Sequence, residues 1–278
     1  MNVKNLFLML GIAALLASCS SEDVPQEPQE NVKTITFSAS LDQKMNSRAE
    51  CDQMTRAIVE VYSDSAATQK EQRIEVTKGS DGKFTFTIPN LISGKKYTFL
   101  FWSDNPIDNQ FDASDLKNVK QNNQHITSVA YSLATTLTPE EISQSGVQLK
   151  HAVAKISLQT TGALTTNDKL RIVYPRYKTF SVLTNFATGR YERGYYDICN
   201  NYNAGDVFCV AYIFGHKETH NFSIEYGGRP IPKDVNNVPI NTNMHIILKS
   251  NFANIGLSNA NVSASFDDNW DSNQTKDF

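Results

Sequence analysis

Residues 83–88 read KFTFTI, and this strict alternation of polar and apolar side chains decides the fold. A period of two directs one face of a strand toward a core and the other toward water. Residues 34–39 (TITFSA) and 73–77 (RIEVT) repeat the pattern, and turn sequences such as KGSDG at residues 78–82 separate the runs. Antiparallel sheets produce this pattern, so the sequence predicts an all-β fold.

Longer apolar runs place further strands along the chain. Residues 97–102 (YTFLFW) are apolar on both faces at all but one position, which predicts a central strand. A second series of strands begins with residues 147–158 (VQLKHAVAKISL) and ends with residues 262–266 (VSASF). The sequence therefore predicts two antiparallel β-sandwiches in tandem, over residues 32–146 and 147–278, each long enough to bury a core.

Two short helices are expected between the strands. Residues 138–141 (TPEE) combine an N-cap threonine, a proline at the first helical position and acids in the first turn. A second helix is expected near Asp112 to Val119.

The charge balance argues against nucleic acid as a partner. The 278 residues include 26 Lys and Arg against 29 Asp and Glu, and the pI is about 6.0. Binding to a phosphate backbone requires clustered basic side chains that displace counterions, and none are clustered here.

The N-terminus reads as an export signal. Lys4 precedes an apolar run of twelve residues at 6–17 (LFLMLGIAALLA), which is shorter than the ~20 residues of a spanning helix. Residues 1–18 are therefore predicted to be a signal peptide. The run ends in LASC at residues 16–19, which resembles the lipobox of bacterial lipoproteins and implies a mature protein that begins at lipidated Cys19. An ordinary signal peptide with an incidental cysteine is the alternative.

The segment after Cys19 is polar and acidic. Residues 19–31 contain SSEDVPQEPQE, which cannot bury apolar surface and predicts a flexible tether. Its acidic pair resembles the surface-export signal of Bacteroidetes lipoproteins, which implies the outer leaflet of the outer membrane. More than one acyl chain is needed for stable anchoring there.

Motifs for catalysis are absent from the sequence. There is no GxGxxG, Walker A, GxSxG or HExxH, so we expect no enzyme activity, no catalytic residue and no cofactor. Residues 216–220 (HKETH) carry two histidines four apart, which on a helix could share a metal. The flanking residues read as hairpin strands, so a polar turn without metal is expected.

One acidic stretch of the sequence partly matches a calcium-binding loop. Residues 267–271 (DDNWD) resemble a calcium loop at three ligands only, and Ser272 and Phe278 stand where an EF-hand needs Gly and Glu. A looser site stays open there or among four acids in one predicted loop: Asp104, Asp108, Asp112 and Asp115. A solvated acidic turn is the favoured reading.

The remaining cysteines do not define a disulfide framework. Cys51, Cys199 and Cys209 are odd in number once Cys19 is lipidated. A pairing of Cys199 with Cys209 stays open.

Several segments together resemble the fimbrillin (FimA/Mfa-like) family of Bacteroidetes lipoprotein pilins. They are the lipobox at Cys19, ITF (35–37), SRA (47–49), TRA (55–57), GKKYTFLFWSD (94–104), LKHAVAKI (149–156), NTNMHIIL (241–248) and Trp270. The resemblance implies two tandem Greek-key, transthyretin-like β-sandwich domains and a role in adhesion.

The resemblance also implies an assembly mechanism. In this family a trypsin-like surface protease cuts after an arginine that follows the first strand, and a strand of another subunit fills the groove left behind. Carried onto this sequence, residues 34–39 depart and the cut follows Arg48, with Arg56 as the runner-up. The donor strand comes from the C-terminal segment, in which three side chains alternate inward: Val262, Ala264 and Phe266. The implied partners are other fimbrial subunits, the protease and the outer membrane through the lipid anchor.

Some roles stay open within this interpretation. The tail after Phe266 is polar and short for a full donor strand, so stalk, tip and anchor subunits are all compatible with the sequence. An anchor would keep its lipid and its first strand, with Arg48 uncut.

A glycan-binding surface lipoprotein is the alternative function. Its expected signature is a platform of exposed aromatic rings, for which four tyrosines are candidates: Tyr191, Tyr195, Tyr196 and Tyr202.

Overall fold

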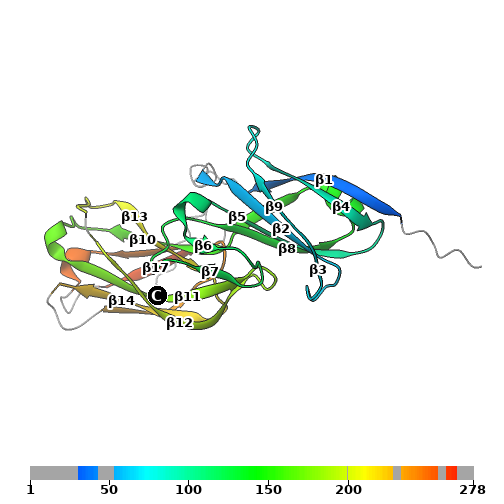
Figure 1. Ribbon diagram of the computed structural model, residues 1–278. Coiled ribbons are helices and arrows are strands. Elements are labelled where there is room, and N and C mark those ends of the chain that lie inside the picture. The colour runs from blue at the N-terminus through cyan, green and yellow to red at the C-terminus, as the bar shows by residue number, and fades with distance from the viewer. Residues whose placement is uncertain (1–30, 43–52, 199, 228–232, 256–260, 268–278) are drawn as a thin grey trace, which may run out of the picture. The chain divides into compact units, whose positions relative to one another are not determined.

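The computed structural model describes residues 31–42, 53–198, 200–227, 233–255 and 261–267. Strands dominate these residues, so the predicted all-β fold is confirmed (Figure 1). Residues 32–278 make up one compact unit. No helix in the described part of the chain is both long and apolar enough to cross a membrane. The signal peptide and Cys19 lie outside the described residues and stay predictions.

The described residues contain seventeen named strands and four named helical elements. In chain order the strands are β1 (Val32–Leu41), β2 (Arg56–Tyr62), β3 (Lys70–Thr77), β4 (Phe84–Ile92), β5 (Tyr97–Asp104), β6 (Phe111–Asp112), β7 (Val119–Gln121), β8 (Tyr131–Leu137), β9 (Val147–His151), β10 (Val153–Thr160), β11 (Leu170–Ser181), β12 (Phe186–Asp197), β13 (Val207–Phe214), β14 (Thr219–Tyr226), β15 (Lys233–Pro239), β16 (His245–Ser250) and β17 (Ser263–Asp267). The helical elements are η1 (Pro106–Asp108), α2 (Pro139–Ser145), η2 (Thr166–Asp168) and η3 (Phe252–Asn254).

The first sandwich is built from one folded sheet. Its strand order is β3-β2-β5-β8-β9-β1-β4, so strands distant in sequence are neighbours, as in Greek-key folds. Phe37 of β1 packs edge-on against Phe101 of β5, three places away in that order, at 6.0 Å between ring centroids. This contact requires the sheet to fold over into two layers. Every residue of β5 is buried, which confirms the predicted central strand.

The second sandwich contains two sheets. One has the order β13-β10-β16-β17, and the other has the order β15-β14-β11-β7-β6 with β12 also paired to β11. Their facing side chains form a second core of buried apolar residues that begins at Ala154 and ends at Ala264. The first core runs from Ile35 to Val153 and also takes in later side chains such as Phe180 and Phe214.

Residues 147–158, which were expected to open the second sandwich, are divided between two sheets. β9 pairs with β1 and β8 in the first sheet, and only β10, which starts after a bend at Ala152, joins the second sandwich. The alternation breaks at the bend, because the four residues 151–154 are all buried and the inward positions change from odd-numbered to even-numbered. Residues 147–158, taken as one run in the sequence, did not reveal where the chain changes sheets.

The two expected helices have different outcomes. α2 is confirmed, with Thr138 as its N-cap and a capping box to Glu141. The helix expected near Asp112 to Val119 is wrong, since β6, a turn and β7 occupy this stretch. Asp112 and Asp115 accept hydrogen bonds from the backbone N–H groups two residues ahead at 3.0 Å, and these local turns compete with a helix.

Candidate functional site

The first strand lies inside its sheet rather than at an edge. β1 pairs antiparallel with β4, from Val32 opposite Ile92 to Ala39 opposite Phe84, and parallel with β9 near its end (Figure 1). The expectation that residues 34–39 form a full strand across the first sandwich is thus confirmed. Without β1, both β4 and β9 would present unpaired backbone groups to solvent.

One face of β1 fills an apolar groove. Four alternating side chains are at most 6% exposed: Ile35, Phe37, Ala39 and Leu41. The Phe37 ring also stacks on that of Phe86 in β4 at 5.7 Å. Burying each of the three large side chains is worth roughly 1.5–3 kcal/mol, so packing contributes substantially to the retention of β1.

Helix α2 contacts the start of β1. Lys33 Nζ donates to Glu140 Oε1 at 2.6 Å, and Ser143 Oγ donates to the carbonyl of Thr36 at 3.4 Å. Glu140 also accepts from Ser93 Oγ at 2.6 Å and from the Gly94 N–H at 3.2 Å. The bond from Lys33, followed by that from Ser93, lowers the pKa of Glu140 to about 2.

This contact predicts a pH-dependent attachment of β1. The pKa of Glu140 lies below its ordinary value of 4.5, so its stabilising effect is present above about pH 4.5 and is lost as the pH falls toward 2. Hydrogen exchange, corrected for intrinsic rates, should show weaker protection of the β1 amides at about pH 3 than at about pH 5. Glu140→Gln should reduce that difference, and an unchanged difference would contradict the role of this pair.

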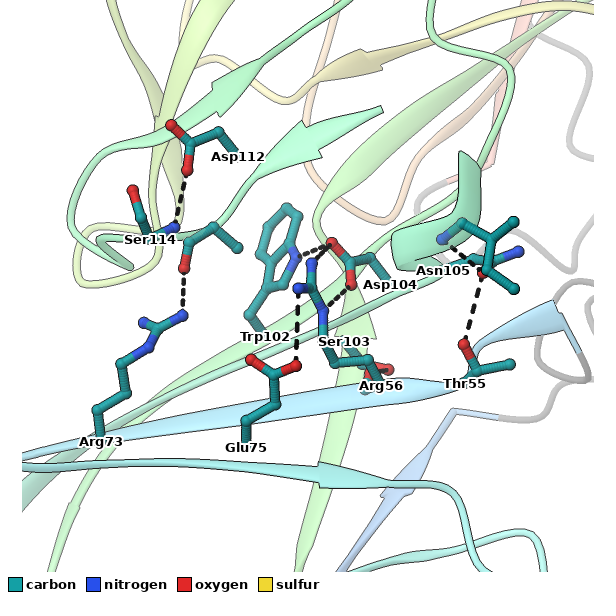
Figure 2. A network of polar contacts seen from close by, with 12 residues as sticks. Thr55, Arg56, Arg73, Glu75, Trp102, Ser103, Asp104, Asn105, Asp112 and Ser114 are labelled. Carbon is teal, nitrogen blue, oxygen red and sulfur yellow. Dashed lines mark hydrogen bonds and ion pairs between the residues drawn. The ribbon is translucent and has the colours of Figure 1, made fainter. Parts of the chain in front are cut away.

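Arg56, at the start of β2, is held in a buried ion pair. Its Nε and Nη2 donate to the two carboxylate oxygens of Asp104 at 2.8 Å each, and Trp102 Nε1 donates to Asp104 Oδ2 at 3.0 Å. Figure 2 shows the guanidinium between Asp104 and Glu75, whose Oε1 lies 3.8 Å from Arg56 Nη1. The hydrogen bond with Asp104 raises the pKa of Arg56 above its ordinary value.

The backbone of Arg56 is equally engaged. It pairs with Thr77 of β3 on one side and with Asp104 of β5 on the other. A trypsin-like protease needs an extended backbone and a free arginine side chain. The backbone of Arg56 is extended but paired on both sides, and its side chain is bound to Asp104, so neither is accessible in the folded protein.

Other predicted processing residues lie outside the described residues. Arg48 and Cys51 belong to residues 43–52, and Cys199 is also outside. The cut after Arg48 and the pairing of Cys199 stay predictions. Cys209 forms no disulfide with a described residue.

The predicted donor residues lie in their own sandwich. β17 pairs with β16 at the end of its sheet, where Ala264 is buried and Val262 and Phe266 pack against the second core. Their inward alternation is confirmed within this chain. Their transfer to another subunit stays a prediction.

Two of the four tyrosines predicted to form an exposed aromatic platform are exposed in the structure. Tyr191 and Tyr195 of β12 are 55% and 51% exposed, and the Arg171 guanidinium lies 4.6 Å from the Tyr195 ring centroid. Tyr196 and Tyr202 instead pack against the second core.

The polar turn predicted at residues 216–220 is confirmed between β13 and β14, but it gathers three side chains. Ligand atoms of His216, Glu218 and His220 lie within 4.8 Å of one another, and no other such cluster occurs among the described residues. The four acids from Asp104 to Asp115 therefore form no cluster. Sequence reasoning considered only helical spacing for the histidines and so missed this arrangement.

Comparisons with known proteins identify a family and a fold. The model of a family described as "Family of unknown function (DUF6562)" matches residues 26–278. No curated protein matches the chain. The tip fimbrial protein Mfa3 of Porphyromonas gingivalis, solved with a C-terminal truncation, has a TM-score of 0.53 at 12% identity, over 84% of this chain and 99% of that one.

Two further solved structures give similar values. A Bacteroides ovatus protein provisionally described as an adhesin has a TM-score of 0.52 at 10% identity, over 84% of this chain and 92% of its own. A Bacteroides thetaiotaomicron protein provisionally described as polysaccharide-binding (DUF1812) has a TM-score of 0.51 at 11% identity, over 77% of this chain and 91% of its own. At such identities the likeness shows the fold, which is the fimbrillin-like fold that the sequence resemblance implied.

Proposed function

The chain belongs to the DUF6562 family, whose function is unknown, and we propose that it is a lipid-anchored cell-surface precursor of a fimbrial subunit with a role in adhesion. Its partners are other fimbrial subunits, and its work needs no catalytic residue and no cofactor. The lipid at Cys19 holds it to the outer leaflet of the outer membrane. The fold shared with a tip fimbrial protein supports this proposal.

The position of β1 is the observation that carries the proposal. This strand covers an apolar groove and pairs with a strand on each side, yet it is joined to the next strand by the arginine-containing segment at residues 43–55. A cut in that segment would release β1 with the tether and open an acceptor groove. A strand from another subunit would then restore the backbone hydrogen bonds, as in β-augmentation.

The cut is assigned to Arg48 rather than to Arg56. The ion pair of Arg56 with Asp104 and its pairing to β3 and β5 oppose proteolysis of the folded protein. Cleavage after Arg48 would leave β2 intact between β3 and β5.

The donor is assigned to the segment from Val262. β17 ends its sheet and has β16 as its only strand neighbour in the sheet order of the described residues, so its departure breaks fewer backbone bonds than that of β1. Val262, Ala264 and Phe266 share the spacing of the inward side chains of β1. A subunit that serves as an anchor would instead keep β1 and its lipid.

Treatment of the secreted precursor with a low dose of an arginine-specific protease, which spares Lys44 in the same segment, tests this mechanism. We expect a new N-terminus at Ala49, followed by SDS-resistant ladders as freed grooves accept donor strands. Arg48→Ala should remain uncut and monomeric under the same conditions. An N-terminus elsewhere in the chain, or cleaved protein that never forms ladders, would reject the assignment.

Glycan binding is the second candidate function, favoured by the exposed Tyr191 and Tyr195 rings on β12. Sugar rings stack on such surfaces through the hydrophobic faces of both partners. Calorimetry with host and plant polysaccharides distinguishes the two functions. Binding that is lost in Tyr191→Ala, together with absent ladders, would favour this candidate.

A further inference from the structure

We propose that the turn between β13 and β14 is a binding site for a divalent transition metal, with Zn²⁺ as the reference ion and His216, Glu218 and His220 as its ligands. This site is independent of strand exchange.

The donor set has the chemistry of a zinc site. Two imidazoles and a carboxylate are common zinc ligands, at about 2.0–2.2 Å from the ion. The three ligand atoms lie within 4.8 Å of one another, whereas tetrahedral ligands at those bond lengths are about 3.3 Å apart. Glu218 is exposed and sits in the turn, so rotation of its side chain can close much of this gap.

The local backbone explains why these residues converge. They are spaced by two, and the chain passes from a bend at Lys217 and Glu218 into β14 at Thr219. Alternate side chains of an extended segment lie on one face of it. The bend directs the side chains of His216 and Glu218 toward that of His220. The backbone N–H of His216 donates to the carbonyl of Ile240, which fixes the start of the turn.

Tyr177 of β11 holds both imidazoles. Its hydroxyl lies 2.7 Å from His220 Nε2, and its ring stacks on His216 at 4.2 Å with an interplanar angle of 10°. When the tyrosine oxygen accepts a hydrogen bond from Nε2–H, His220 Nδ1 carries the lone pair that a metal requires. Tyr177 and His220 are both buried, so this orientation is set before any ion binds.

One hydrogen bond competes with a metal ion for a ligand atom of His216. His216 Nδ1 accepts from the Glu218 N–H at 3.1 Å, and coordination through that nitrogen would replace this bond. A three-ligand site also keeps a position for water or for an oxygen of a bound molecule. Of the three ligands, His220 lines a cavity of about 420 Å³, together with Tyr191.

Calorimetric titration of the full chain with zinc chloride tests the site, using protein purified with a histidine-free tag. We expect binding of a single Zn²⁺ per chain and a higher melting temperature in its presence. His216→Ala and Glu218→Gln should each weaken binding at least about 10-fold, because each removes a ligand from a set of three. Both positions are outside the buried core, so these variants should fold.

The controls separate this site from adventitious binding. His245→Gln, which changes a histidine of β16 that bonds Ser157 Oγ at 2.8 Å, should bind zinc like the unaltered chain. The double variant His216→Ala/Glu218→Gln should lose both binding and the rise in melting temperature. Failure of the unaltered chain to bind zinc, or binding that persists in the double variant, would overturn the proposal.

Discussion

Replacing Phe37 with alanine is expected to lower the free energy of unfolding by about 3–5 kcal/mol. The Phe37 side chain is 4% exposed and contacts the Phe86 and Phe101 rings at 5.7 and 6.0 Å between centroids. Alanine would remove the transfer free energy of the ring and leave a cavity that these neighbours can only partly fill. Denaturant unfolding, with the midpoints compared at constant slope, measures the change.

Thr36→Ala is the matched control on the same strand. Thr36 is exposed, and its hydroxyl lies 3.2 Å from that of Thr87 across the strand pair, a contact worth about 0.2–1 kcal/mol. If Phe37→Ala cost no more than Thr36→Ala, β1 would not be packed in the groove, and the observation that carries the proposed function would fail.

The same substitution bears on assembly. Once the chain is cut after Arg48, β1 is retained by non-covalent contacts alone, and its release becomes dependent on concentration. Phe37→Ala should therefore speed the release of the β1 peptide and the appearance of ladders in cleaved protein. This acceleration would be absent in an Arg48→Ala background, since β1 stays covalently joined.

Much of the fold could be predicted because its signals are local. The alternation in residues 34–39 and 83–88 set which side chains of β1 and β4 are buried, and the cap at Thr138 set the start of α2. The misplaced helix at residues 112–119 shows the limit of such signals. Acidic residues favour helix starts and Asx turns alike, and here Asp112 and Asp115 form turns.

The contacts that define the site are long-range, and a single sequence does not record them. Lys33 meets Glu140 across 107 positions, and Arg56 meets Asp104 across 48. Arg56 was a plausible cleavage residue by motif alone, because TRA at residues 55–57 repeats the pattern of SRA at residues 47–49. What disfavours Arg56 is its partner on β5, which the sequence does not record.

Arg56→Met, in the network of Figure 2, should therefore lower the free energy of unfolding by about 3–5 kcal/mol. Methionine keeps the apolar stem but removes the guanidinium from Asp104, whose side chain is 2% exposed. The carboxylate would keep the Trp102 N–H, bonded at 3.0 Å, without a compensating positive charge. Unfolding in denaturant measures the loss, and Arg56→Met/Asp104→Asn should recover most of it, because no charge is then buried and the amide oxygen still accepts from Trp102 Nε1.

Glu75→Ala is the control, since it removes the other carboxylate near the same guanidinium. Glu75 is 52% exposed and its oxygen lies 3.8 Å from Arg56, so its loss should cost less than about 1 kcal/mol. A large difference between the two variants would assign the stabilisation to the pair of Arg56 with Asp104 and would support the proposal that a protease spares Arg56. Equal effects would mean that Arg56 is weakly held, and cleavage after it would again compete with cleavage after Arg48.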